Sequence, residues 1–366
     1  MTKIKEIVSF LEAWAPNIYQ EDYDNAGLIV GDSNTEVAKI LITLDVTEAV
    51  VNEAISKGAN LIIAHHPIIF KGLKKLNGKN YVEKTVLLAI KNDIALFASH
   101  TNLDHIVGGV NWKIAEKIGL KNLEILSPKP QTLLKLTVFV PENYSAQLLN
   151  TLYESGAGNI GNYENCSFTS QGIGQFTPKE GAKPNIGIIN RQERVQESKI
   201  EVILPMHLQV AVLEAMFQAH PYEEVAYFLT KLENQNQEIG AGAIGELDFE
   251  MDENEFLTHL KQSMKLNTIK YTPIANKKIK KVAICGGAGS FLLKNARGKN
   301  ADAFVTADYK YHEFFDAEGQ ILIADIGHYE SEVYTKELIH FKISNKFSNF
   351  ATLLSETNTN PIQYFN

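Results

Sequence analysis

The chain has 366 residues, of which 45% are hydrophobic and 21% charged, and this length is sufficient for two or three globular domains. Its formal net charge of −8 argues against a large nucleic-acid-binding surface, which would need a basic face. No apolar run reaches the length of a transmembrane helix, and the N-terminal segment lacks the apolar block of a signal peptide. The two cysteines, Cys166 and Cys285, lie far apart, which excludes a thiolate zinc framework and is typical of a reduced, cytoplasmic protein.

The first third of the chain alternates between helical and extended patterns. Residues 4–15 have the apolar spacing of a helix, and Thr47 is suited to cap a helix that stops at Gly58. Such alternation predicts parallel β-α-β units, with helices on both faces of the sheet. The expected strands are residues 28–30, 40–46, 61–64 and 94–98, and the expected helices after the first are residues 47–57 and 82–93.

Polar side chains follow these strands at the point where each strand ends. His65 and His66 come directly after a buried strand, His100 and Asp104 follow the next one, and Asp45 ends the strand before them. Ligands of parallel sheets gather beyond the carboxyl ends of the strands, so we expect these side chains to share one site. Upstream, Asp24 and Asn25 are interpreted as turn-forming residues, with a site role as the alternative, and the double glycine of GGVN at residues 108–111 as a tight turn rather than a phosphate cradle.

From about Pro128 the pattern changes. Strands are expected at residues 133–141, 198–204 and 225–232, with helices at residues 144–156 and 208–219, which suggests a split β-α-β, ferredoxin-like insert. The segment HPYEE that follows the second helix is interpreted as a turn rather than a second metal site. The expected domains are therefore residues 1–127 and 232–366, which together form one α/β core, and residues 128–231, which form the insert.

The C-terminal part returns to the first pattern and adds two candidate ligands. Its expected strands, residues 281–284, 303–306 and 321–326, again end in small or polar residues. His328 and Glu332 follow the last strand at a spacing of four residues, which would put both on one face of a helix. The alternative for such a pair is a solvated contact on a helix surface.

These residues together suggest a metal site without thiolates. Three imidazoles and two carboxylates suit zinc, manganese, iron, cobalt or nickel in a hydrolytic site. Five protein ligands exceed what one catalytic ion with an open position needs, so we expect two ions that share a bridging carboxylate. The expected ligands are His65, His66, Asp104, His328 and Glu332.

The ordered motifs HHPIIF, SHTNLD, GGVN, GGAGSF, DYKYH and GHYESE resemble those of the GTP cyclohydrolase I type 2 homologue family, also called the Nif-three-like family. The resemblance covers nearly the whole chain. It implies an α/β core with mostly parallel sheets, an insert similar to the CutA or PII-type fold, a dinuclear metal site with the same five ligands, and a toroidal homohexamer. By motif, His100 and His312 match further histidines near that site. The chain departs from the family pattern at four positions that are not ligands, namely Tyr23, His105, Ala307 and Ser331.

The function implied by the resemblance is hydrolysis that opens the five-membered ring of GTP or a related nucleotide, with His100 or His312 moving the proton. A phosphoesterase that uses the same two metals is the nearest alternative. A metal-loaded scaffold or regulator, with an insert that senses a small molecule or partner, is the non-enzymatic one. The net charge disfavours a third function, the threading of nucleic acid through a ring.

Overall fold

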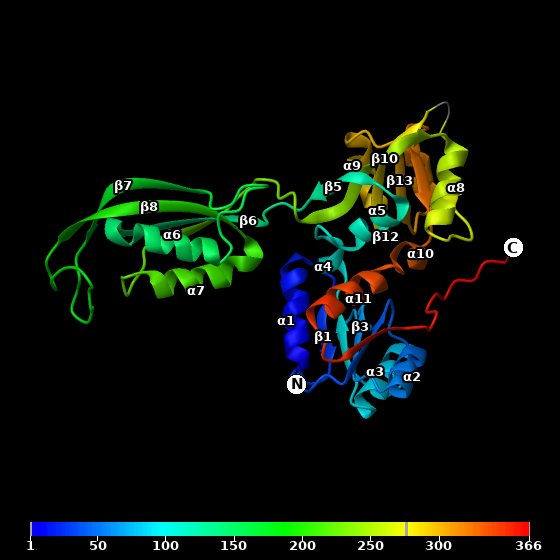
Figure 1. Ribbon diagram of the computed structural model, residues 1–366, viewed down its shortest axis with the longest axis horizontal. Coiled ribbons are helices and arrows are strands. Elements are labelled where there is room, and N and C mark those ends of the chain that lie inside the picture. Colours follow the sequence, from blue (N-terminus) through cyan, green and yellow to red (C-terminus); the bar gives the residue numbers. More distant parts are fainter. Residues whose placement is uncertain (1, 275–276, 366) are drawn as a thin grey trace. The chain divides into compact units, whose positions relative to one another are not determined.

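Three β-sheets with helices packed against them form a mixed α/β fold in the computed structural model, which describes residues 2–274 and 277–365 (Figure 1). The chain divides into two compact units. Unit 1 runs from the N-terminus to Pro128 and from Glu238 to the C-terminus, and unit 2 is Lys129–Gln237. None of the described helices combines the length and the apolar character that crossing a membrane would require.

The first sheet of unit 1 is mostly parallel, with strand order β1-β4-β3-β2-β15, and only β1 is antiparallel to its neighbour. Helix α1 packs on one face through Ile4 and Ile7, whereas helices α2 and α3 pack on the other. The strands are β1 (Gly27–Val30), β2 (Lys39–Thr43), β3 (Leu61–Ala64), β4 (Ala95–Ala98) and β15 (Ala351–Leu354), and the helices are α1 (Ile4–Trp14), α2 (Glu48–Lys57), α3 (Tyr81–Lys91) and α11 (Thr335–Lys346).

Helix α2 shows how local sequence sets the ends of these elements. The Thr47 side chain accepts a hydrogen bond from the Val50 amide, and Gly58 ends the helix with a φ of 69°. Both features confirm the prediction, because a threonine at the N-cap and a left-handed glycine after the last turn satisfy backbone groups that the helix leaves free.

The second sheet of unit 1 has the order β11-β14-β13-β12-β10-β5, and its parallel part is β12, β13 and β14. Helices α5 and α8 cover one face, and α9 covers the other. The strands are β5 (Lys121–Pro128), β10 (Gly240–Met251), β11 (Lys270–Tyr271), β12 (Ile279–Ala288), β13 (Ala303–Ala307) and β14 (Leu322–Asp325). The helices are α4 (Thr101–Asp104), α5 (Val110–Ile118), α8 (Glu253–Ser263), α9 (Leu293–Gly298) and α10 (His328–Glu332), with a 3₁₀ segment at Tyr311–Ala317.

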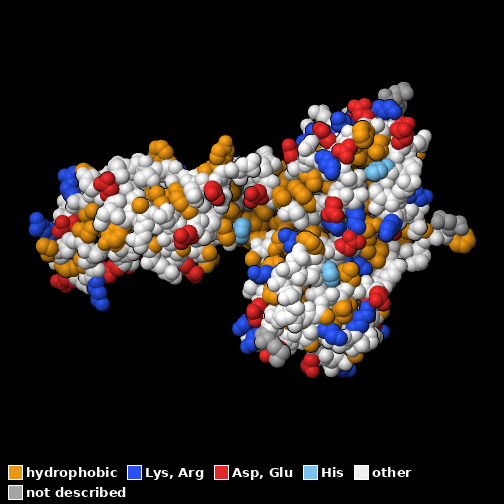
Figure 2. All heavy atoms as spheres, viewed as in Figure 1, with side chains coloured by type: hydrophobic (Ala, Val, Ile, Leu, Met, Phe, Trp, Pro, Cys, Tyr) orange, Lys and Arg blue, Asp and Glu red, His pale blue; other side chains and the backbone are white. Residues whose placement is uncertain are grey.

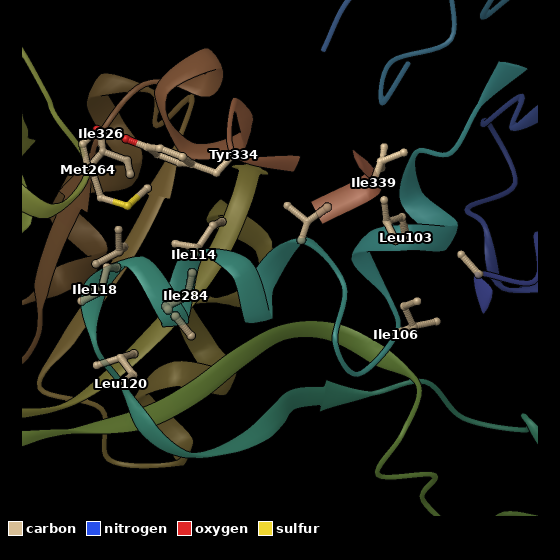
Figure 3. Packing of buried hydrophobic residues seen from close by; sticks show 14 of the residues in the cluster. Leu103, Ile106, Ile114, Ile118, Leu120, Met264, Ile284, Ile326, Tyr334 and Ile339 are labelled. Atoms are coloured by element: carbon tan, nitrogen blue, oxygen red, sulfur yellow. Dashed lines mark hydrogen bonds between the residues drawn. The ribbon is translucent and has the colours of Figure 1, made fainter. Parts of the chain in front are cut away.

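One hydrophobic cluster joins the two sheets of unit 1. Figure 3 shows Ile114 and Ile118 of α5 beside Ile284 of β12, with Leu103 near Ile339 of α11. These side chains are at most 1% exposed, and the same cluster includes strand residues of the first sheet. Because apolar burial stabilises the folded state in proportion to the area removed from water, this layer fixes the two sheets as one body.

Unit 2 has the element order β-α-β-β-α-β and one antiparallel sheet, β7-β8-β6-β9. In Figure 1 the helices α6 and α7 lie side by side along the sheet, and their apolar residues share a core with it. The elements are β6 (Leu133–Pro141), α6 (Ser145–Glu154), β7 (Ser167–Phe176), β8 (Glu193–Pro205), α7 (Gln209–Ala219) and β9 (Tyr227–Lys231). On the face that Figure 2 shows, acidic and basic side chains are interspersed.

Candidate metal centre

The carboxyl ends of parallel strands from both sheets of unit 1 open on one cavity of about 1030 Å³. His66 follows β3, His100 follows β4, and His328 opens the short helix α10 after β14. His65, the neighbour of His66, is fully buried. The predicted gathering of polar side chains at strand ends is therefore observed, but the strands belong to two separate sheets.

Each of these four histidines is held through its Nδ1 atom, which leaves Nε2 for the cavity. The partner is a carboxylate in three cases and a backbone carbonyl in the fourth. Such outer contacts fix the orientation and tautomer of a metal-binding imidazole. The contacts are His65 with Ser99 O at 2.9 Å, His66 with Asp45 Oδ1 at 2.7 Å, His100 with Asp24 Oδ1 at 2.8 Å, and His328 with Asp308 Oδ2 at 2.7 Å.

Glu332 lies between the imidazoles and divides its two oxygens among them. Its Oε2 is 2.9 Å from His66 Nε2 and 3.1 Å from His328 Nε2. Its Oε1 is 3.8 Å from His65 Nε2. Among the described residues, two groups of potential ligand atoms are compact, and within each group the atoms lie within 4.8 Å of one another. One group is His66, His328 and Glu332, and the other is His65, His66 and His100.

Two buried polar atoms beside the cavity indicate that the site fits a cation. Within the described part of the chain, His65 Nε2 and Asp104 Oδ1 are buried without a hydrogen-bond partner, and they are 3.7 Å apart. A buried polar atom that lacks a partner costs free energy, so two of them facing each other require an explanation. An imidazole nitrogen and a carboxylate oxygen are ligands of zinc and related divalent ions, and the residues present fit such an ion.

Ionisation of the site follows from the same contacts. Burial lowers the pKa of His65 and raises that of Asp104. Burial also tends to lower the pKa of His66. The hydrogen bonds with Asp45 and Glu332 outweigh this effect and raise the His66 pKa to about 10. Burial also opposes ionisation of Glu332, yet its contacts with the imidazoles hold its pKa well below the usual range. A cation would therefore have to displace a proton from His66, which makes metal affinity dependent on pH.

Two glycines and an asparagine shape the backbone around Glu332. A Cβ atom on Gly287, whose φ is +60°, would lie 2.5 Å from Glu332 Oε1. Asn111 donates a hydrogen bond to the Asp104 carbonyl and accepts one from the Gly286 amide, which ties α5 to both sides of the cavity.

The GGVN motif forms a turn, as predicted, with Gly108 at a φ of +75°. The HPYEE segment is also a turn, in which His220 contacts the Phe139 carbonyl.

The structure separates the two predicted proton-transfer residues. The His100 ring lies beside His65 and His66, with ring centroids 5.3 Å and 5.4 Å apart. His312 is exposed on the 3₁₀ segment, stacks on Phe315 and is not among the cavity-lining residues of its own chain. Of the positions that depart from the family pattern, Tyr23 and His105 line the cavity, whereas Ser331 accepts a hydrogen bond from the Gly287 amide.

The sequence does not indicate which carboxylates contact the Nδ1 atoms of the histidines. Asp24, interpreted as a turn residue, accepts hydrogen bonds from His100 and from Thr101. The strand-end pattern places Asp45 near the site but indicates no partner for it, and the DYKYH motif, which begins at Asp308, indicates no contact for that carboxylate. Each is an acidic residue directly after or near a strand end, and that signal alone does not show which histidine it would contact.

Comparison with known proteins gives a family match over nearly the whole chain. The sequence pattern described as Duf34/NIF3 (NGG1p interacting factor 3) matches residues 2–361. A protein of Bacillus subtilis named "GTP cyclohydrolase 1 type 2 homolog" is 38% identical over 366 residues, which covers 98% of each chain. A relative from Halalkalibacterium halodurans has the same name, identity and coverage.

Solved structures agree with this match. The crystal structure of a Bacillus cereus protein related to NIF3 is 40% identical and has a TM-score of 0.87, and the alignment covers 100% of this chain and 99% of the other. A Staphylococcus aureus protein is 32% identical with a TM-score of 0.79 and the same coverage.

Proposed function

The chain belongs to the Duf34/NIF3 family, and from this premise we propose that it is a hydrolase with two divalent metal ions, acting on the ring of a purine nucleotide or a related compound. The observation that carries the proposal is the division of the Glu332 oxygens between two sets of ligands. Oε2 would join His66 and His328 on one ion, and Oε1 would join His65 and Asp104 on the other. Zinc, iron, manganese, cobalt and nickel all suit these donors.

When bound, such ions act as Lewis acids and make water a nucleophile near neutral pH. The residues of the chain would supply the rest. In the hydrolysis, water adds across a C–N bond of the ring: its oxygen goes to carbon, the C–N bond breaks, and a proton goes to nitrogen. His100 is the candidate to carry that proton, because it lies at the centre and Asp24 orients it through Nδ1.

We propose a nucleotide-like substrate because the relatives are named as homologues of GTP cyclohydrolase 1 type 2. The proposed assembly is a homohexamer. His312 would then serve a cavity only as a residue of a second copy, since it lies outside the cavity of its own chain. We also propose that residues 128–231 form a separable, ferredoxin-like insert of the CutA or PII type, which the order β-α-β-β-α-β and the antiparallel sheet of unit 2 support.

Two alternatives remain testable against this proposal. A phosphoesterase would use the same ions to bind phosphate oxygens, and a regulatory scaffold would bind metal without turnover. The test is to purify the protein, measure its metal content and incubate it with a nucleotide panel, using mass spectrometry to detect ring opening or phosphate release. Glu332→Gln should abolish turnover, whereas Glu250→Gln, on an exposed residue of β10, should not. Phosphate release without ring opening would support the phosphoesterase, and metal binding without any turnover would support the scaffold.

A further inference from the structure

The cavity extends well beyond the metal centre, and its outer wall is aromatic. Phe70 lies edge-on to His100, with ring centroids 5.6 Å apart, so the aromatic surface continues outward from the imidazoles. Phe70 is 48% exposed and Phe291 is 67% exposed, and both line the cavity. Exposed aromatic faces at a cavity mouth are suited to stack on planar rings, which they do with little dependence on ring identity.

Apart from its histidines, the cavity wall carries charges of one sign. Among the described residues that line the cavity there is no lysine or arginine. The four lining carboxylates are those of Glu21, Asp45, Asp104 and Glu332. Two divalent ions would bring four positive charges, which only balance these carboxylates.

Because the two ions only balance the carboxylates, the cavity has no excess positive charge for a triphosphate. This limits which nucleotides can bind with their ring at the ions, as ring hydrolysis requires. If the ring of the substrate lies at the ions, a triphosphate lies away from them, against a wall of aromatic, apolar and acidic side chains. Sites that recognise phosphates use arginine, lysine or clustered backbone amides, because each phosphate oxygen must recover the hydrogen bonds and the counter-charge that it had in water. If the triphosphate instead lies at the ions, the ring is held away from them and cannot react there.

We infer that the substrate of this cavity is an uncharged planar heterocycle, of the class of a nucleoside or free purine-like base, stacked on the exposed face of Phe70 beside the histidine cluster, and not a nucleoside triphosphate. The inference rests on the proposed function for the position of the reacting ring. The cavity volume of about 1030 Å³ is sufficient for a nucleoside, since pockets for small molecules commonly reach this size.

The test is binding, measured apart from turnover. Guanosine, GTP and inorganic tripolyphosphate are titrated calorimetrically into the metal-loaded protein at low and at physiological salt. We expect guanosine to bind at least as tightly as GTP, with little dependence on salt, and tripolyphosphate not to compete with it. GTP that binds ten or more times tighter than guanosine, or tripolyphosphate that displaces guanosine, would overturn the inference, because phosphate recognition would then dominate.

Two pairs of variants locate the effect. Phe70→Leu keeps apolar volume but removes the ring, and it should weaken guanosine binding about tenfold, whereas Phe168→Leu, at a 67% exposed residue of unit 2, should not. Ile362→Lys adds a cation to the cavity wall at a 52% exposed residue and should raise affinity for GTP but not for guanosine. Ile160→Lys, at a 53% exposed residue of unit 2, is its control. No guanosine binding, or equal binding by Phe70→Leu, counts against the inference, whereas binding without ring opening counts only against the hydrolase.

Discussion

Glu332 Oε2 lies 2.9 Å from His66 Nε2, although 266 positions separate the two residues in the sequence. The carboxylate is 4% exposed at its side chain, and its other oxygen faces His65. One buried anion therefore contacts imidazoles that come from two sheets. A carboxylate in this position offsets the repulsion between two cations, which neutral imidazoles cannot do.

Replacing Glu332 by glutamine should cost both ions, or leave one. The substitution keeps the size and one oxygen but removes the charge that two ions would share. His66→Ala, in contrast, should weaken chiefly one ion, because it removes a single nitrogen. The measurement is metal stoichiometry with melting temperature, with and without chelator, since binding to the native state raises the melting temperature by mass action. If Glu332→Gln keeps two ions at wild-type affinity, Asp104 becomes the candidate bridge.

Asp45 should act on the metal through His66. Its Oδ1 lies 2.7 Å from His66 Nδ1, and its Oδ2 accepts a hydrogen bond from Thr359 Oγ1 at 2.5 Å. Asp45→Asn should lower metal affinity about 10–100-fold, which is the usual effect of losing such an outer partner. Competition against a chromophoric chelator measures it, with Asp248→Asn, on an exposed strand residue, as the control. Equal affinities of the two variants would contradict a positioning role for Asp45.

Gly287 should be intolerant of a side chain. Its φ of +60° is a left-handed conformation that costs other residues about 1–2 kcal/mol. A Cβ atom there would also approach Glu332 Oε1 to 2.5 Å, so Gly287→Ala should both lower the melting temperature and weaken metal binding. Gly298→Ala is the matched control, because a Cβ atom at Gly298 meets nothing within 4 Å. Wild-type metal affinity in Gly287→Ala would show that the backbone can move without disturbing Glu332.

Glu53 should make stability depend on acid pH. Burial opposes its ionisation, but hydrogen bonds from Lys57, Ser355 and Thr357 lower its pKa from 4.5 to about 2. Because the pKa is lower in the folded state, the stabilisation is present above about pH 4.5 and is lost as the pH falls towards 2.

The measurement for Glu53 is the free energy of unfolding as a function of pH. Glu53→Gln should lose about 1.5–3 kcal/mol at neutral pH, the value of hydrogen bonds to a charged group, and should flatten the profile below pH 4.5. A variant profile parallel to that of the wild type between pH 2 and 4.5 would rule out Glu53 as the titrating group.

The insert should be removable without loss of the metal centre. Pro128 of β5 and Gly240 of β10 are paired partners in the second sheet, so the chain leaves unit 1 and re-enters it at adjacent positions. Replacing residues 129–237 with Asn-Gly would leave a four-residue loop, Asn-Gly-Glu238-Ile239, between the paired Pro128 and Gly240, and loops of this length are common in hairpins. We expect a folded protein with wild-type metal stoichiometry, measured by circular dichroism and elemental analysis. An insoluble product, or a folded one without metal, would show that unit 2 is integral to the core.

The sequence alone was sufficient to place the chemistry at strand ends. His65, His66 and His100 follow short apolar runs, and a parallel sheet brings such positions to one edge whatever the details of packing. Thr47 and Gly58 likewise set the ends of α2 because capping depends on residues next to each other in the chain. The turns at GGVN and HPYEE were predictable for the same local reason.

Only the tertiary structure decided which side chains meet. Two sheets, not one, supply the cavity, and the contact between His66 and Glu332 depends on how the shared core packs one sheet against the other. The contacts of Asp24, Asp45 and Asp308 with particular imidazoles, and the place of His312 outside the cavity, depend on loop conformations. Hydrophobic periodicity specifies which face of an element is buried. It carries no information on which polar groups, far apart in the sequence, that burial brings within hydrogen-bond distance.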